Sequence, residues 1–251
     1  MRLPARCLAA VASFLLSGGA VIVQPAQAGI AAVRPPAAGR NLDALGPLKA
    51  DLELWLSMDS IKQGGVAWSR GPVKLVASSE VEVQDEEGQR WLDFNEPGAV
   101  LKFEPALQIG TRYTLSSWML VPAPRRHALL WQGVKDSGCP LFVSDTGLYG
   151  WNAVRHEQVT FAHLPKGFTG WHHFAVTCDG ETTTAFLDGR KVGSVPEVLA
   201  TNILSIGNHW MRAHQHWMMC DGLDDQFIFR RPLTEEEVRT VMKLGRQQAR
   251  K

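Results

Sequence analysis

Short apolar runs separated by turn residues recur along most of the chain. Between residues 52 and 58, Leu and Met alternate with Glu53, Trp55 and Ser57, which is the two-residue period of a strand with unlike faces. Further runs bounded by Gly, Pro, Asn or Asp predict strands over residues 73–77, 81–83, 91–94, 99–103, 113–121, 128–131, 141–143, 148–151, 158–161, 171–178, 182–187, 203–206 and 223–229. This spacing predicts an all-β fold, a two-sheet antiparallel sandwich of the jelly-roll type.

The clearest turn signals flank the run at residues 182–187. Asp179-Gly180 precedes this run and Asp188-Gly189 follows it. An Asp-Gly pair between strands predicts a tight hairpin, because the turn needs positive φ and Gly adopts it without steric cost. We therefore expect the strands around these two turns to form an antiparallel meander.

Residues 231–245 have the pattern of a helix. Thr234 followed three residues later by Glu237 is a capping box, and three consecutive glutamates fill the first turn, where the helix dipole favours negative charge. Val238 and Val241 begin an apolar stripe, and Gly245 supplies the stop. The pattern predicts a short C-terminal helix that packs on the outside of the sandwich.

The first 28 residues have the layout of a secretory signal peptide. Arg2 and Arg6 precede an apolar run that ends at Val23, and the small-x-small sequence Ala26-Gln27-Ala28 follows. The alternative is a retained membrane anchor, since the run is near the length that spans a bilayer. Either interpretation predicts a secreted, periplasmic or cell-surface protein.

The rest of the chain divides by composition. Residues 29–47 are rich in Ala, Pro and Gly without a period, which predicts a flexible leader. One jelly-roll domain is expected over residues 48–246, and residues 247–251 form a tail. The sequence shows no internal repeat of fixed period.

The charge of the chain is close to balanced. The sequence has 26 Lys and Arg against 25 Asp and Glu, for a net charge of +1, and removal of the two signal-peptide arginines makes it about −1. Nucleic acid or an anionic membrane as a partner would need a basic patch, and no run of charges supplies one. We therefore expect no nucleic acid as a partner, and a membrane only if the N-terminal segment is retained as an anchor.

Three cysteines remain if the signal peptide is removed: Cys139, Cys178 and Cys220. In an oxidising compartment one pair can bridge and one thiol is left over, and the sequence does not choose the pair. The alternative is three buried thiols that pack as small hydrophobic groups. The absence of a C-x-x-C pair argues against a zinc ribbon.

The order of several motifs carries a family resemblance. They are Trp91-Leu92-Asp93-Phe94, Tyr113-Thr114-Leu115-Ser116-Ser117-Trp118, Gly170-Trp171-His172-His173-Phe174, Ala185-Phe186-Leu187-Asp188-Gly189, Leu204-Ser205-Ile206-Gly207-Asn208 and Asp221-Gly222-Leu223-Asp224. Over about residues 50–245 the chain resembles the laminin-G-like jelly roll of the concanavalin A-like lectin/glucanase superfamily. The resemblance implies a concave and a convex sheet. Members bind glycans or proteins, and some are glycoside hydrolases.

Catalysis is not expected from this sequence. The hydrolases of this fold resemble one another in a Glu-x-Asp-x-x-Glu strand that holds two carboxylates a few ångströms apart, and no such run is present. The acidic run at residues 85–87 lies beside a turn glycine, and neighbouring carboxylates on an extended chain point to opposite sides.

A calcium ion is the cofactor that the resemblance implies. Asp224 matches the aspartate that opens the last strand in related domains and helps to hold calcium with backbone carbonyls, and Asp221 and Asp59 are candidate helpers. Gln226 and Phe227 depart from the family pattern at this point. The alternative is that Asp224 accepts backbone N–H groups where the strand begins.

Two segments have the composition of a sugar-binding surface. Residues 208–220 contain Trp210, His214 and a second tryptophan; their rings can stack on sugars, cover the core, or, in a His-x-His pair, hold a transition metal. In the middle strands, an aromatic residue stands beside an amide at Trp131-Gln132 and at Tyr149-Gly150-Trp151-Asn152, and either pair can instead pack inward. The candidate ligand-binding residues are Trp151, Asn152, Trp210, His214, Trp131 and Tyr149.

Three function classes remain open. The first is an exported, non-catalytic lectin-like module that recognises a glycan, with structural calcium as a further expectation. The second is a cell-surface domain that holds another protein and has no sugar site. The third is a glycoside hydrolase, which a close pair of carboxylates in a cleft would favour. An exposed aromatic patch would distinguish the first class from the second.

Overall fold

The computed structural model describes residues 42–59, 66–86, 89–121, 128–134, 137–144, 146–208 and 220–245. The expected signal peptide, most of the expected leader and the tail from residue 246 lie outside these ranges. In the part that is described, no helix is both long enough and apolar enough to cross a membrane.

Sixteen strands, one 3-10 helix and one α-helix make up the described part of the chain. The elements are η1 (Leu42–Asp51), β1 (Leu52–Leu56), β2 (Val66–Ser69), β3 (Leu75–Ala77), β4 (Glu82–Glu86), β5 (Gln89–Phe94), β6 (Leu101–Gln108), β7 (Arg112–Val121), β8 (Ala128–Gln132), β9 (Cys139–Val143), β10 (Gly147–Asn152), β11 (Glu157–His163), β12 (Gly170–Asp179), β13 (Thr183–Leu187), β14 (Arg190–Val195), β15 (Asn202–Ile206), β16 (Cys220–Phe229) and α2 (Glu235–Leu244).

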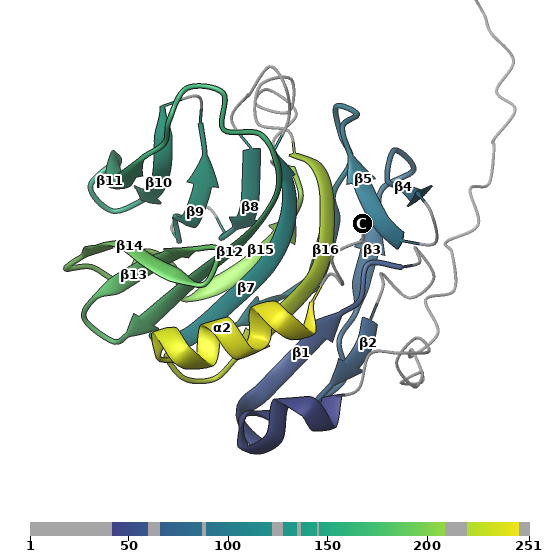
Figure 1. The fold of residues 1–251 in the computed structure, drawn as a ribbon, viewed down its shortest axis with the longest axis horizontal. Coiled ribbons are helices and arrows are strands. Elements are labelled where there is room, and N and C mark those ends of the chain that lie inside the picture. The colour runs from purple at the N-terminus through teal and green to yellow at the C-terminus, as the bar shows by residue number, and fades with distance from the viewer. Residues whose placement is uncertain are drawn as a thin grey trace, which may run out of the picture.

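The strands form two antiparallel sheets that pack face to face (Figure 1). Sheet A has the order β14-β13-β12-β7-β16-β1-β2, with β5 also paired to β16 and β4 to β5. Sheet B has the order β11-β10-β9-β8-β15-β6-β3. The fold is the all-β jelly-roll sandwich that the sequence predicts.

The core lies between the sheets. Leu115 and Met119 of β7 and Leu130 and Leu141 of sheet B belong to one fully buried cluster. Alternate residues of each strand face this layer, because successive side chains of a strand point to opposite faces. Each such side chain contributes about 1.5–3 kcal/mol through its removal from water.

The outer face of sheet A is covered by η1 and α2, which lie across it in Figure 1. Leu42, Leu45 and Leu48 of η1 are buried in one cluster with Trp55 of β1 and Val238 of α2. The prediction of a flexible leader to residue 47 is therefore wrong at its C-terminal end. The three leucines find their apolar partners on distant elements, so the local Ala- and Pro-rich composition does not reveal them.

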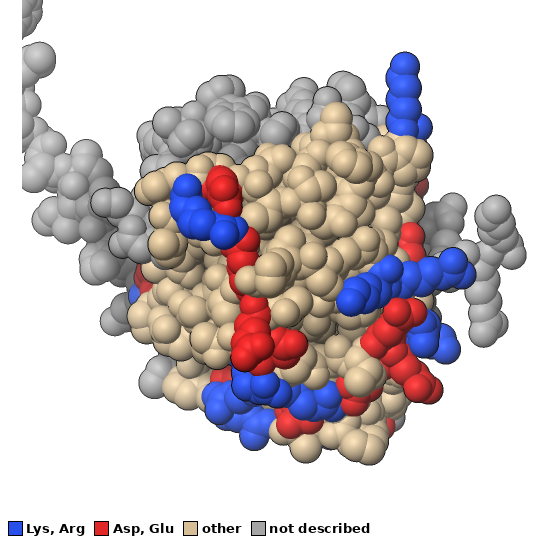
Figure 2. All heavy atoms as spheres, turned by 90° about the vertical axis from the view of Figure 1, so that its left-hand side faces the viewer, with Lys and Arg blue, Asp and Glu red and all other residues tan. Residues whose placement is uncertain are grey.

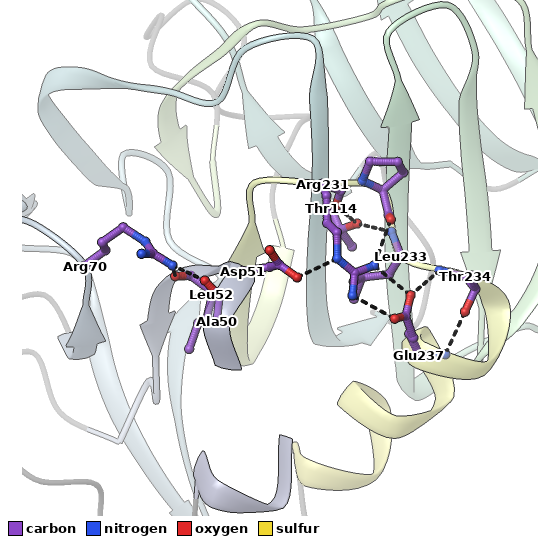
Figure 3. A network of polar contacts seen from close by, with 10 residues as sticks. Ala50, Asp51, Leu52, Arg70, Thr114, Arg231, Leu233, Thr234 and Glu237 are labelled. Atoms are coloured by element: carbon purple, nitrogen blue, oxygen red, sulfur yellow. Dashed lines mark hydrogen bonds and ion pairs between the residues drawn. The ribbon is translucent and has the colours of Figure 1, made fainter. Parts of the chain in front are cut away.

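A polar network joins these covering elements to the sheet (Figure 3). The guanidinium of Arg231 donates to Asp51 Oδ2 at 2.6 Å and, through two nitrogens, to both carboxylate oxygens of Glu237 at 2.7 and 2.8 Å. Thr114 Oγ1 donates to the Arg231 carbonyl and accepts from the Leu233 amide. The Arg231 hydrogen bonds lower the pKa of Glu237 to about 2. The network fixes the chain between β16 and α2.

The capping box at the start of α2 is confirmed. Thr234 Oγ1 accepts from the Glu237 amide at 3.3 Å, and the Glu237 carboxylate accepts from the Thr234 amide at 2.8 Å. Val238 and Val241 are buried, and Gly245 is the C-cap. The helix packs on the outside of the sandwich, as predicted.

The two predicted Asp-Gly turns are present in the β12–β13–β14 meander. Asp188 and Gly189 have φ values of 48° and 75°, which suit a two-residue hairpin between β13 and β14. Asp188 also accepts from the His173 amide at 3.0 Å and contacts His172 Nδ1 at 2.9 Å. Burial opposes the charge of Asp188, but these hydrogen bonds hold its pKa below the usual value.

The three cysteines are free and buried, which decides between the two alternatives for them. Burial raises the pKa of Cys139 to about 12 and raises that of Cys220 well above its ordinary value. Thiols of this kind pack as small hydrophobic groups and are poor nucleophiles.

The sandwich closes where the edge strands β11 and β14 meet. A Cβ at Gly193 of β14 would lie 2.0 Å from the carbonyl oxygen of Phe161 on β11, so the two backbones can approach this closely only because residue 193 is glycine. The hairpin of β10 and β11 is thereby held against sheet A.

Candidate ligand-binding site

Strand β10 places two aromatic residues on the outer face of sheet B. Leu148 belongs to the core, and a Cβ at Gly150 would meet the core residues Leu199 and Val159, so these two positions face inward. Tyr149 and Trp151 alternate with them and face outward. The structure thus brings two of the predicted binding residues to one face.

Buried groups support the outward face beside Trp151. The rings of Tyr149 and Phe142 lie 5.7 Å apart and form a cluster with Cys139, all 6% exposed or less. The Tyr149 hydroxyl is 2.7 Å from Thr146 Oγ1, and the Cys139 thiol donates to Gln132 Oε1 at 3.0 Å. Tyr149 is therefore a support for the site and presents little surface of its own.

Trp151 is the aromatic residue of this face that remains accessible. Its side chain is 37% exposed, and it lies opposite Gln158 of β11 and Cys139 of β9 in the ladder. Its carbonyl packs on the turn before β9, where a Cβ at Gly138 would lie 1.7 Å from the Trp151 oxygen. The two backbones can approach this closely because residue 138 is glycine.

Asn152 holds the tip of the β10–β11 hairpin. Its Oδ1 accepts from the amides of Val154 and Arg155, both at 2.9 Å, and its Nδ2 donates to the carboxylate of Glu197. An Asn that bonds the backbone two and three residues ahead stabilises a turn. The carboxamide thus makes three hydrogen bonds within the protein, and its contact with a ligand stays a prediction.

Arg155 lies between two carboxylates at this tip. Its Nε pairs with Glu157 at 2.6 Å and its guanidinium also pairs with Glu197. The Arg155 and Glu157 side chains are 51% and 49% exposed, whereas that of Glu197 is 12% exposed. Glu157 lies opposite Asn152 in the ladder, one residue along from Trp151, so these two side chains project to the side away from the Trp151 ring. We use the name Trp151 rim for this end of the hairpin, which comprises Trp151, Asn152, Arg155, Glu157 and Glu197.

Figure 2 looks onto the edge of the molecule where β11 and β14 meet. Acidic and basic side chains lie next to one another on this face, and uncharged surface separates the groups. No broad patch of one sign is visible there. This face offers little attraction to a polyanion such as nucleic acid.

Trp131 does not belong to the site. It is fully buried in the core, and its Nε1 donates to Gln226 Oε1 of the opposite sheet at 2.8 Å. The prediction that Trp131 contacts ligand is wrong, because the ring faces inward and fills the space between the sheets. Its neighbour Gln132 points the other way, toward Cys139.

The other predicted aromatic platform, with Trp210 and His214, lies outside the described residues. So does His216, its partner in the His-x-His pair. Their roles in sugar stacking, core covering or metal binding stay predictions.

The three predicted calcium ligands are not gathered into one site. Among the described residues, no three side chains of His, Cys, Asp or Glu are placed to hold a metal together, and Asp59, Asp221 and Asp224 are all described. Asp224 is 1% exposed and lies opposite Trp118 in the ladder of β16 and β7. A calcium site built from Asp224 and backbone carbonyls stays a prediction, which thermal melting with and without calcium would check.

His173 and Ser116 form a buried pair that resembles a base and a nucleophile. His173 Nε2 lies 2.8 Å from Ser116 Oγ, and both residues are 1% exposed. Burial lowers the pKa of His173 to about 3. The carboxylate nearby, Asp188, bonds the backbone amide of His173 rather than its ring, so it does not orient the imidazole as a catalytic triad requires. The pair is structural.

The sequence interpretation missed Arg155, Glu157 and Glu197. Glu197 follows β14 and reaches Asn152 across 45 positions of sequence, so no local spacing reveals it. Arg155 and Glu157 stand in a polar turn after a predicted strand, which is a signal for a hairpin but not for a ligand site.

Comparisons with known proteins agree with this architecture. A family model described as the concanavalin A-like lectin/glucanases superfamily matches residues 95–239, more than half of the chain. No curated protein matches. Three similar solved structures are two binding domains and one domain of an arabinanase.

The ligand binding domain of botulinum neurotoxin serotype D, in complex with N-acetylneuraminic acid, has a TM-score of 0.61 at 11% identity over 80% of this chain and 52% of that chain. The binding domain of Paraclostridial Mosquitocidal Protein 1 has a TM-score of 0.58 at 16% identity over 78% and 52%. Domain 4 of AbnA, an arabinanase from Geobacillus stearothermophilus, in complex with arabinotriose, has a TM-score of 0.54 at 16% identity over 76% and 98%.

At these identities the similarity is one of fold, and the chain spans about half the length of the two toxin chains. The two sheets and the strand order define the protein as a jelly-roll sandwich of the laminin-G type. The chain belongs to the concanavalin A-like lectin/glucanases superfamily.

Proposed function

We propose that this chain is an exported, non-catalytic lectin-like domain that recognises a glycan at the Trp151 rim. The observation that carries the proposal is the exposure of Trp151, which faces outward from β10 opposite the amide residue Gln158 of β11. Sugar rings stack their C–H faces on aromatic rings, while polar groups at the edge take the hydroxyls.

The similar folds support a binding role. Arabinotriose is bound to the AbnA domain and N-acetylneuraminic acid to the neurotoxin domain. Export rests on the signal-peptide pattern of residues 1–28, which is independent of the fold.

The arrangement of carboxylates favours binding over hydrolysis. Glu157 and Glu197 are the close pair of carboxylates in the rim, and both pair with the single guanidinium of Arg155. A glycosidase needs one carboxylic acid that carries a proton and one free carboxylate. Both carboxylates of the rim are instead held by one arginine, so neither is a free carboxylate of this kind.

The variant Trp151→Ala tests the proposal. We expect it to weaken binding to any glycan that the parent protein binds on a glycan array by at least tenfold, because the stacking surface is lost. The melting midpoint is expected to change by less than about 3 °C, since the ring is partly exposed and its backbone is unchanged. Titration calorimetry with the best array ligand gives the fold-change.

The control is Trp68→Ala on the edge strand β2, which removes another incompletely buried tryptophan far from the rim along sheet A. It is expected to keep parental binding. Equal binding by Trp151→Ala and the parent would overturn the site, and no binding to any glycan would favour a protein-interaction domain instead. Release of reducing sugar during the incubation would show hydrolysis.

A further inference from the structure

We propose that Gln158 binds two neighbouring hydroxyl groups of the sugar that stacks on Trp151, so that the ligand is a glycan with a free vicinal diol. This inference rests on the proposed function and adds to it the chemical group that the site recognises. The observations that carry it are the place of Gln158 in the ladder of β10 and β11 and the unused hydrogen-bonding groups of its side chain.

Gln158 and Thr160 face outward from β11. The residues that alternate with them, Val159 and Phe161, belong to the core between the sheets, and successive side chains of a strand point to opposite faces. Gln158 and Thr160 are both exposed. The outer face of sheet B therefore has a strand with polar side chains, β11, directly beside β10 with its aromatic side chains (Figure 1).

Gln158 is a direct cross-strand neighbour of Trp151. Opposite residues of an antiparallel pair have Cβ atoms about 4.5–5.5 Å apart, so the Gln158 carboxamide is within reach of a ligand that lies on the indole. The neighbour on the other side, Cys139 of β9, is 4% exposed and donates to Gln132. Of the two cross-strand neighbours of Trp151, Gln158 is thus the accessible one.

The Gln158 carboxamide is available to a ligand. Within the described residues its oxygen and nitrogen make no hydrogen bond, whereas the Asn152 carboxamide makes three. A glutamine side chain presents an acceptor oxygen beside an amino group with two donor hydrogens. Two hydroxyls on neighbouring carbons of a sugar ring also lie side by side, so one can donate to the oxygen while the other accepts from the nitrogen.

The next pair of the ladder does not offer this combination. Tyr149 lies opposite Thr160, but Tyr149 is 6% exposed and its hydroxyl is 2.7 Å from Thr146 Oγ1. An accessible aromatic ring and an amide without hydrogen bonds therefore occur together at Trp151 and Gln158. This pair places the stacked sugar with its hydroxyl-bearing edge toward β11.

The expected effect is that of single hydrogen bonds. One such bond changes an affinity by about fivefold. Because Gln158 is exposed, water replaces a partner that is lost, and the effect stays near this value. Removal of either hydroxyl of the diol is therefore expected to weaken binding by about fivefold.

The experiment uses the full chain and a glycan that binds on the array. Monodeoxy analogues of that glycan, one for each hydroxyl, are titrated by calorimetry against the parent protein, Gln158→Leu and Gln108→Leu. Leucine is close to glutamine in size and lacks both hydrogen-bonding groups. Gln108 is exposed on β6, which is separated from β11 by four strands of sheet B, so its variant is the matched control. Melting midpoints check that both variants are folded.

We expect the parent and Gln108→Leu to lose about fivefold in affinity for the analogues at two neighbouring positions, and Gln158→Leu to bind those analogues as tightly as the complete glycan. A Gln158→Leu variant that discriminates like the parent, or a bound glycan without a vicinal diol, would overturn this inference. Either result would leave the loss of binding in Trp151→Ala, and with it the proposed function, untouched. Failure of every glycan to bind would overturn both.

Discussion

At the scale of single residues, burial sets the chemistry of His173. The imidazole is 1% exposed, contacts Ser116 Oγ at 2.8 Å and lies edge-on to Trp118 with the ring centroids 5.5 Å apart. Burial lowers its pKa to about 3, because a charged imidazolium would lose its hydration. The folded protein thus keeps a neutral histidine over a pH range in which the unfolded chain takes up a proton.

The pH dependence of stability follows from that difference. An unfolded histidine titrates near pH 6.5, so between pH 6.5 and 3 protons bind the unfolded state and the folded state loses stability as the pH falls. We expect this residue to remove about 2 kcal/mol from the free energy of unfolding between pH 7 and pH 5. Urea unfolding at the two pH values measures it.

The test variant is His173→Gln, which keeps a polar group toward Ser116 but has no proton to bind. Its free energy of unfolding should fall by about 2 kcal/mol less than that of the parent over the same interval, whatever its absolute stability. His163→Gln, at an exposed position of β11, is the control. A slope shared by His173→Gln and the parent would contradict the assignment.

At the scale of elements, one helix is fixed by hydrogen bonds between residues close in sequence and the other by contacts with residues far away in sequence. The capping box fixes the start of α2 with two reciprocal hydrogen bonds, and Arg231 anchors the same turn through Glu237. Helix η1, in contrast, owes its place to the burial of its leucines against sheet A and α2. An element that is held by tertiary contacts is harder to predict from the local sequence than one that is held by its cap.

The Thr234 cap makes a measurable contribution to the free energy of unfolding. Thr234→Ala removes the side-chain acceptor of the Glu237 amide and is expected to lower the free energy of unfolding by about 1 kcal/mol. Thr240→Ala in the same helix removes a hydroxyl that bonds the Glu236 carbonyl four residues back, which does not help a helix, so it should be neutral or slightly stabilising. Equal losses in both variants would argue against the cap.

Local sequence patterns predict some of these features and not others. The Asp188-Gly189 turn and the Thr234 cap each depend on residues at most three positions apart, so the sequence predicts both. Trp131 and Trp151 stand in similar aromatic-amide pairs, yet one faces the core and the other the solvent, because a bulge in the ladder between Leu129 and Trp131 shifts the alternation. The contact of Glu197 with Asn152 depends on the meeting of two sheets, which no local pattern encodes.

At the scale of the whole molecule, one polar chain ties the two sheets together. Trp131 Nε1 of sheet B donates to Gln226 Oε1 of sheet A, and Gln226 Nε2 donates to Ser117 Oγ of the neighbouring strand β7. All three residues are fully buried. Buried polar groups that satisfy one another add a directional constraint to an otherwise apolar interface.

Trp131→Phe breaks this chain. We expect a loss of about 2–4 kcal/mol in the free energy of unfolding, from the unsatisfied Gln226 oxygen and the smaller ring. Trp151→Phe should change it by less than about 0.5 kcal/mol, because that ring is exposed. Chemical denaturation compares the two, and a small effect at Trp131 would show that the sheets do not depend on this bond.

The pairing of Asn152, Arg155 and Glu197 at the hairpin tip also bears on rates. The turn is held by the side chains of Asn152 on β10 and of Glu197 after β14, so association with the proposed ligand would order few backbone dihedral angles and would need no slow loop closure. Encounter should then proceed at a similar speed for all sugars that fit. The lifetime of the complex, rather than the speed of its formation, would separate a good ligand from a poor one.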